Sequence, residues 1–172
     1  MDAKMIAPSA APGRAQTFNG PLESGLRSLV LLTEAHPRDF DLQSMVVLDY
    51  LLLHTAQLSG PDDLHPPVPF RSAEFLVRRG LVERGLLLMM TRGLVERQAG
   101  SDGIRYRASE AASPFLEALR QPYFAEIRIR ARWISSIFGA LDDAGIRAVL
   151  RRYVDRWAEE FHAVERGLAA EA

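Results

Sequence analysis

The sequence predicts a mainly α-helical protein with one small β-hairpin, arranged as a winged helix-turn-helix core followed by C-terminal helices. Three observations lead to this prediction. Apolar residues recur with helical spacing over most of residues 21–92. Two short β-type runs, Leu94–Arg97 and Ile104–Arg107, then flank a turn that contains glycine and aspartate. Helical periodicity returns from Ser109 onward.

The first two expected helices differ in how their apolar residues are distributed. Residues 21–35 place apolar side chains on one face, with Asn19 as the expected N-cap and Pro21 in the first turn. A second helix is expected over residues 41–57, with Asp41 as its N-cap. Its apolar residues lie on nearly every side, which is typical of a helix that is buried all round or covered by a partner.

Glycines mark the expected boundaries that follow. Gly80 is expected to divide residues 72–92 into two short helices, and Gly93 to end the second of them. Asp102 and Gly103 indicate the tight turn of the hairpin. Three further helical stretches are expected after the hairpin, over residues 109–120, 122–138 and 142–167.

These elements suggest a division of the chain into four parts. We expect a disordered tail (1–19), a winged-helix domain (20–120), a C-terminal helical segment (121–167) packed on it or on a partner, and a frayed end (168–172). No apolar run approaches the roughly 18 residues needed to cross a bilayer. The tail also lacks the apolar region of a secretory signal. We therefore expect a cytoplasmic protein with no membrane contact.

Composition and motifs argue against an enzyme. The 172 residues include no cysteine, which excludes disulfides, thiolate metal sites and a cysteine nucleophile. The four histidines lack metal-binding helical spacing, and no nucleotide-binding glycine loop or GxSxG motif is present. We expect no catalytic residue, metal, cofactor or small-molecule substrate. An enzyme that uses Asp49 and His54 is kept as a third hypothesis, although an arginine such as Arg27 is expected to neutralise Asp49 in a buried pair.

The net charge of −1 conceals an uneven distribution of charge. Residues 20–64 hold two arginines and seven acidic residues, whereas residues 78–132 hold eleven arginines and six acidic residues. Two arginine pairs in the basic half share a face, one pair on the second β-run and one on a helix. A solvated face, or a patch that meets an acidic protein, is the alternative to nucleic acid. The candidate contacts to nucleic-acid phosphates are Arg105, Arg107, Arg128 and Arg132.

The helix that would read DNA in a winged helix carries a run of apolar residues instead. A DNA-reading helix exposes polar side chains to base edges. A continuous apolar run covers every face of the helix, so we expect its surplus apolar surface to bind another protein chain. The alternative function is a DNA-binding winged-helix transcription regulator. The expected partner interface consists of Leu86, Leu87, Leu88, Met89 and Met90, with Val47 and Leu51 of the second helix.

Three separated blocks, Pro21–His54, His65–Arg97 and Asp102–Leu119, occur in an order that resembles a known family. They are similar to the middle component of ABC three-component systems, which are bacterial conflict systems of the Lamassu type. The resemblance spans roughly Pro21 to Phe161. It implies two partners, an SMC-like ABC ATPase that senses DNA and an effector subunit, with the middle component connecting them. The implied role is a non-enzymatic subunit of an anti-phage and anti-plasmid complex that meets DNA through the complex.

Overall fold

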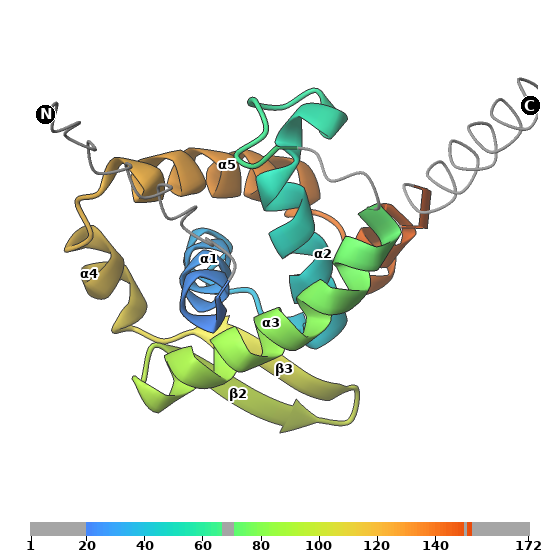
Figure 1. Ribbon diagram of the computed structural model, residues 1–172. Helices are drawn as coiled ribbons and strands as arrows, with labels where there is room; N and C mark the ends of the chain where they lie inside the picture. The colour runs from blue at the N-terminus through green and yellow to red at the C-terminus, as the bar shows by residue number, and fades with distance from the viewer. Residues whose placement is uncertain (1–19, 67–70, 150, 153–172) are drawn as a thin grey trace, which may run out of the picture.

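The structure is a computed structural model that describes residues 20–66, 71–149 and 151–152, with side chains omitted for residues 71–76. This part of the chain is mainly helical and has a small antiparallel sheet (Figure 1). The mainly helical class and the predicted hairpin are therefore confirmed. The elements in chain order are α1 (Pro21–Glu34), β1 (Phe40–Asp41), α2 (Leu42–Leu53), the 3-10 helix η1 (Thr55–Leu58), α3 (Arg71–Thr91), β2 (Val95–Gly100), β3 (Gly103–Ala108), α4 (Ala112–Glu117) and α5 (Pro122–Phe138).

Some expectations fall on residues outside these ranges. The predicted tail and the Asn19 cap lie there, as do the predicted frayed end and residues 153–167 of the last helix. Within the described part, residues 143–149 are helical. The Asp142 side chain accepts a hydrogen bond from the backbone N–H of Gly145 at 2.7 Å, which places this aspartate at the beginning of that helix.

The sheet has the strand order β1-β3-β2, so β3 is its central strand. The hairpin register pairs Val95 with Ala108 and Gly100 with Gly103. Gly103 has a φ of +107°, a conformation that favours glycine. The two-residue β1 was not predicted, because a strand this short carries no periodicity. It pairs Phe40 with Tyr106 and joins the hairpin to the segment between α1 and α2.

The third helix corrects one prediction, because α3 continues through Gly80 without interruption. A glycine inside a helix costs about 1 kcal/mol relative to alanine, and the packing of α3 against α1 and α2 outweighs that amount. Gly93 ends the helix as predicted. It has a φ of +68°, and its N–H donates to the Met90 carbonyl while the Leu94 N–H donates to the Met89 carbonyl.

Two other helices are shorter than predicted. The expected Asp41 cap of α2 is confirmed, since its carboxylate accepts a hydrogen bond from the Ser44 N–H at 2.7 Å. The helix ends at Leu53, because His54 adopts a non-helical conformation and the chain tightens into η1. Only Ala112–Glu117 of the stretch predicted over residues 109–120 forms the α-helix α4.

The core is centred on α1, which contacts α3, α5, α2, α4 and β3. Figure 1 shows α1 between α5 on one side and α3 with the hairpin on the other. At the crossing of α1 and α3, a Cβ atom added to Gly25 would lie 2.6 Å from the carbonyl oxygen of Gly85. Since neither position carries a side chain, the two backbones are in direct contact there.

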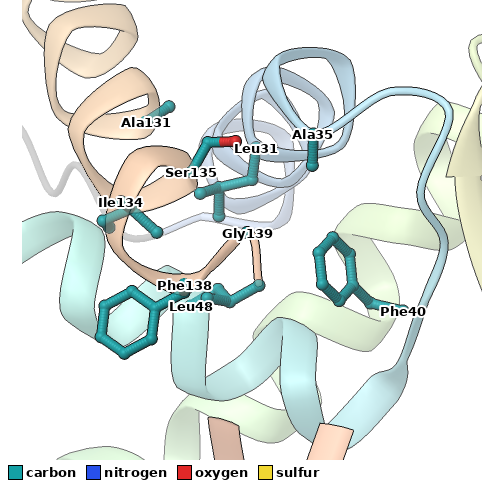
Figure 2. A pocket seen from close by; sticks show the side chains of 9 residues that line it. All are labelled: Leu31, Ala35, Phe40, Leu48, Ala131, Ile134, Ser135, Phe138 and Gly139. Carbon is teal, nitrogen blue, oxygen red and sulfur yellow. The ribbon is translucent and has the colours of Figure 1, made fainter. Parts of the chain in front are cut away.

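A small cavity lies between the end of α1, α2 and α5 (Figure 2). Its volume is about 20 Å³, which is room for one water molecule and far below the roughly 300 Å³ of a small-molecule site. We interpret it as a packing defect of the core. Its lining residues are Leu31, Ala35, Phe40, Leu48, Ala131, Ile134, Ser135, Phe138 and Gly139.

Candidate interaction surfaces

The predicted pairing of Asp49 with Arg27 is confirmed, and a second arginine joins them. The carboxylate of Asp49, on α2, accepts a hydrogen bond from Arg27 Nε of α1 at 2.7 Å. Its other oxygen accepts from Arg78 Nη1 of α3, also at 2.7 Å. All three side chains are buried. One carboxylate thus links three helices through charge-assisted hydrogen bonds.

The two guanidiniums decide the charge state of this cluster. Burial by itself raises the pKa of Asp49, but the charges of Arg27 and Arg78 outweigh burial and hold that pKa below its ordinary value. Burial by itself also lowers the pKa of Arg27, and the Asp49 carboxylate outweighs it and raises that pKa. Asp49 is therefore an ionised structural group enclosed by its partners, with no exposed surface on which a substrate can bind.

Polar side chains continue this cluster toward the surface. Glu23 accepts a hydrogen bond from Arg27 Nη1 at 3.0 Å and another from the Tyr123 hydroxyl of α5. His65 Nε2 lies 3.5 Å from that hydroxyl. Burial raises the pKa values of Glu23 and Tyr123 and lowers that of His65. These residues tie α1, α5 and the segment after η1 together.

His54, the other residue of the enzyme hypothesis, has different neighbours from Asp49. Its ring stacks at a tilt against Tyr50, with centroids 4.6 Å apart, and its Nδ1 atom lies 3.7 Å from Asp63. The side chain is buried. Among the described residues, no group of three or more histidine, aspartate or glutamate side chains is placed to hold a metal ion.

Most residues of the expected partner interface lie inside the core of this chain. Leu86, Met89, Val47 and Leu51 are fully or almost fully buried by neighbouring elements of the same chain. The physical reason is that α3 packs against α1 and α2 as well as against β2, so the fold covers more than one of its faces. An interface in this conformation therefore cannot include these four side chains.

The remaining three residues of that interface are at the surface or near it. Leu87 has 46% of its side chain exposed, whereas Leu88 and Met90 are partly buried against the core. Two exposed apolar residues nearby were not predicted: Val77, 68% exposed on α3, and Leu22, 59% exposed at the start of α1. We call Val77, Leu87 and Leu88, which all lie on α3, the α3 face.

Helical spacing groups Leu22 with Leu26, Leu29 and Val30 on the inward face of the first helix, and the exposure of Leu22 corrects that assignment. A Cβ atom on Gly85 would lie 2.9 Å from the carbonyl oxygen of Pro21, the residue before Leu22. The beginning of α1 therefore lies beside the middle of α3. Val77 is missed because periodicity identifies inward-facing residues, and an isolated outward-facing apolar residue has no pattern.

The four predicted phosphate contacts are mostly engaged within the chain. Arg105 donates to Asp39 at 2.7 Å and to Asp143 at 2.5 Å, and these hydrogen bonds raise its pKa further. Arg107 pairs across the hairpin with Glu96 at 2.7 Å. Arg132 of α5 lies 3.1 Å from Glu34 at the end of α1. Arg128, by contrast, forms no ion pair with any residue in the described ranges.

A different set of arginines is exposed on α3 and the hairpin. These side chains form no ion pairs within the part of the chain that the structure covers. The sequence does not distinguish them from the paired arginines, since pairing here depends on which distant acidic residue the fold brings near. They are Arg79, Arg84, Arg92 and Arg97.

The fold and these surfaces define a class of protein: a small helical protein with an internal ion-pair cluster and exposed apolar helix faces. Residues 17–160 match the family described as ABC-three component (ABC-3C) system Middle Component 2, and the chain belongs to this family. Neither a curated protein nor a solved structure matches the chain. Among the described helices, none combines the length and the hydropathy that crossing a bilayer requires.

Proposed function

We propose that this middle component is a non-enzymatic connecting subunit that bridges an SMC-like ABC ATPase and an effector in an anti-phage and anti-plasmid defence complex. In this role it helps to control the effector and meets DNA through the complex. Family membership supports the existence of partner components. The observation that carries the proposal is the α3 face, where apolar side chains remain exposed in the part of the chain that the structure describes.

The order of the elements supports a winged-helix interpretation. Helix, short strand, two helices and a hairpin follow one another, and the first strand pairs with the second strand of the hairpin. In that interpretation α3 is the recognition helix and β2–β3 is the wing. The α3 face then uses the surface of a DNA-reading helix to bind the ATPase, because Val77 and Leu87 expose apolar side chains there beside the exposed arginines.

The proposal assigns no catalytic role because the side chains of both candidate residues, Asp49 and His54, are buried among other groups of the chain. Asp49 is enclosed between two arginines, and His54 is buried against Tyr50. Alanine variants of either residue are expected to act on stability. A loss of complex function in a His54→Ala variant that keeps its fold would instead favour the enzyme hypothesis.

Co-purification of the complete complex tests the docking role. The variant Val77→Asp with Leu87→Asp places two charges on the α3 face without touching the core. We expect it to reduce recovery of the ATPase at least tenfold, with an unchanged melting temperature. Ile104→Asp is the matched control, since Ile104 is an exposed apolar residue near the hairpin turn. Full recovery of the ATPase with the double variant would contradict the proposal.

The second candidate function, a DNA-binding regulator, is favoured by the exposed arginines of α3 and β2. It predicts that the isolated protein shifts duplex DNA at low salt, with a steep salt dependence. Binding should then weaken in Arg84→Ala with Arg97→Ala and persist in Arg105→Ala, whose side chain already contacts Asp39 and Asp143. The connecting-subunit proposal expects no shift by the isolated protein.

A further inference from the structure

The outward side of α5 carries an apolar stripe that the described part of the chain leaves uncovered. Ile129 is 52% exposed and Ile137 is 46% exposed, and Trp133 lies between them, partly buried. The spacing of four residues places all three on neighbouring positions of one helix face. Ile127 and Ile134 already supply the inward face, so the core does not require this second apolar face.

The helix that presents this stripe is held rigidly. Arg38 donates hydrogen bonds to the carbonyls of Phe138 and Gly139 at 3.1 and 2.9 Å, which fixes the C-terminal end of α5. Near its middle, the Ser135 hydroxyl donates to the Glu34 carbonyl at the end of α1. A rigid helix loses little conformational freedom when a partner binds, which favours affinity.

Trp133 has a fixed position within the stripe. A Cβ atom on Gly60 would lie 2.6 Å from its indole ring, so the loop after η1 packs directly against one side of the ring. The ring is held there and leaves part of its surface in solvent. Fixed aromatic side chains are the usual anchors of protein interfaces.

The charges at the border of the stripe indicate the chemistry of a partner. Arg132, with 66% of its side chain exposed, and Arg128 lie one turn apart beside Ile129. On the other border Glu126 is neutralised by Arg130 at 2.6 Å. Arg132 also pairs with Glu34 at 3.1 Å, whereas Arg128 forms no ion pair within the described ranges. The unbalanced charge at this border is therefore the positive charge of Arg128, which complements acidic side chains. An antiparallel second copy of the chain would bring the same arginines toward one another.

From this we infer that the α5 stripe, defined as Ile129, Trp133 and Ile137, binds an amphipathic helix of a partner that places acidic residues beside Arg128 and Arg132. The inference rests on the proposed connecting function, in which this partner is the effector subunit. Figure 1 shows α5 on the side of α1 opposite to α3. The α5 stripe and the α3 face therefore allow two partners to bind at the same time.

The test compares two variants in the complete complex. Ile129→Asp with Ile137→Asp is expected to reduce effector recovery at least tenfold while the ATPase is retained. The Val77→Asp and Leu87→Asp variant is expected to show the opposite pattern. Arg128→Glu should reduce effector recovery severalfold without changing the melting temperature, and an acidic-to-lysine change on the effector helix should restore it. Unchanged effector recovery with the Ile129 and Ile137 variant overturns the inference.

Other outcomes identify other occupants or a different failure. A dimer of the isolated chain in light scattering that becomes a monomer in the same variant would assign the stripe to a second copy. Recovery of the effector only after removal of residues 153–172 would assign it to the chain's own C-terminal residues. If the wild-type chain recovers the ATPase but never the effector, the connecting function itself fails, whereas effector recovery that survives the variant refutes only the α5 assignment.

Discussion

Asp49 joins three helices through two arginines. Arg27 also reaches Glu23 at 3.0 Å, and Arg78 pairs with Asp49 at 2.7 Å. Removing one member of a buried ion cluster leaves uncompensated charge in a medium of low dielectric constant. The cluster is therefore a stability element for the packing of α1, α2 and α3.

We predict that Asp49→Asn destabilises the protein by about 3–5 kcal/mol, because it removes the buried negative charge that the two guanidiniums share. The measurement is the free energy of unfolding in urea. Asp39→Asn is the control, since Asp39 pairs with Arg105 near the surface and such a pair is worth about 1 kcal/mol or less. Equal losses in the two variants would contradict a special role for the buried cluster.

The same carboxylate predicts the pH dependence of stability. Because the pKa of Asp49 is lowered in the folded state, its contribution is complete above its ordinary value of 3.8 and is lost as the pH falls through the folded pKa. Glu23 acts in the opposite direction, since its pKa is raised. We expect the free energy of unfolding to fall steeply below about pH 4, and this acid limb should be flatter in Asp49→Asn.

At this scale the sequence predicts one half of the cluster. An aspartate on the apolar face of a helix requires a cation, and Arg27 follows from its place on the preceding helix. Arg78 was missed because Gly80 suggested a helix boundary next to it, whereas the continuous α3 holds Arg78 opposite Asp49. The charge requirement is local, but the identity of the partners depends on tertiary packing.

At the scale of elements, the close crossing of α1 and α3 requires glycine at the contact, and apolar periodicity in the sequence does not identify such positions. Gly25 and Gly85 allow the two backbones to touch, so any side chain at either position pushes the helices apart. Gly80, in the same helix, faces only the flexible end of Arg84 at 3.5 Å. Gly25 and Gly85 are therefore required for close helix packing, whereas Gly80 is not.

We predict opposite effects of alanine at these glycines. Gly25→Ala and Gly85→Ala should each destabilise the protein by about 1–3 kcal/mol through overpacking. Gly80→Ala should stabilise it by about 0.5–1 kcal/mol, since alanine favours the helix and meets no backbone atom there. Thermal unfolding of the three variants measures both signs, and stabilisation by Gly25→Ala would show that the helices do not cross closely at this position.

Strong local signals made several elements predictable. Asp41 caps α2, Gly93 ends α3 and Gly103 follows the hairpin turn, as each residue type suggests. The two-residue β1 depends on pairing with β3 instead, so residues 40–41 carry no signal of their own. The all-round apolar character of α2 and of the Leu86–Met90 run correctly indicated deep burial, but the fold supplies much of the cover that we assigned to a partner.

Across the whole molecule, the acidic and basic halves of the sequence meet inside the fold. Acidic residues of the first half pair with arginines of the second half: Glu34 with Arg132, Asp39 with Arg105, and Asp41 with Arg147. These intramolecular ion pairs therefore neutralise part of the charge asymmetry that suggested a nucleic-acid surface. Sequence alone shows the imbalance but not its neutralisation, which depends on contacts between distant residues.

We predict that Arg105→Gln loosens the helical residues 143–149. Arg105 connects β3 to Asp143, while Arg147 connects the same segment to Asp41. Hydrogen exchange should show faster amide exchange in residues 143–149 of the variant and unchanged exchange in the buried part of α3. The matched variant Arg107→Gln, which breaks only a cross-strand surface pair, should leave residues 143–149 unchanged. Equal exchange in both variants would contradict the link.

The central position of α1 also has a consequence during synthesis. This helix is translated before the other described elements, yet its apolar side chains Leu29–Leu32 are buried by elements that include α5. The contact between Glu34 and Ser135 spans 101 residues. The nascent chain therefore carries an incompletely covered leucine-rich helix until almost all of the domain has been translated. Among the described segments, we expect a chaperone to bind α1 in particular.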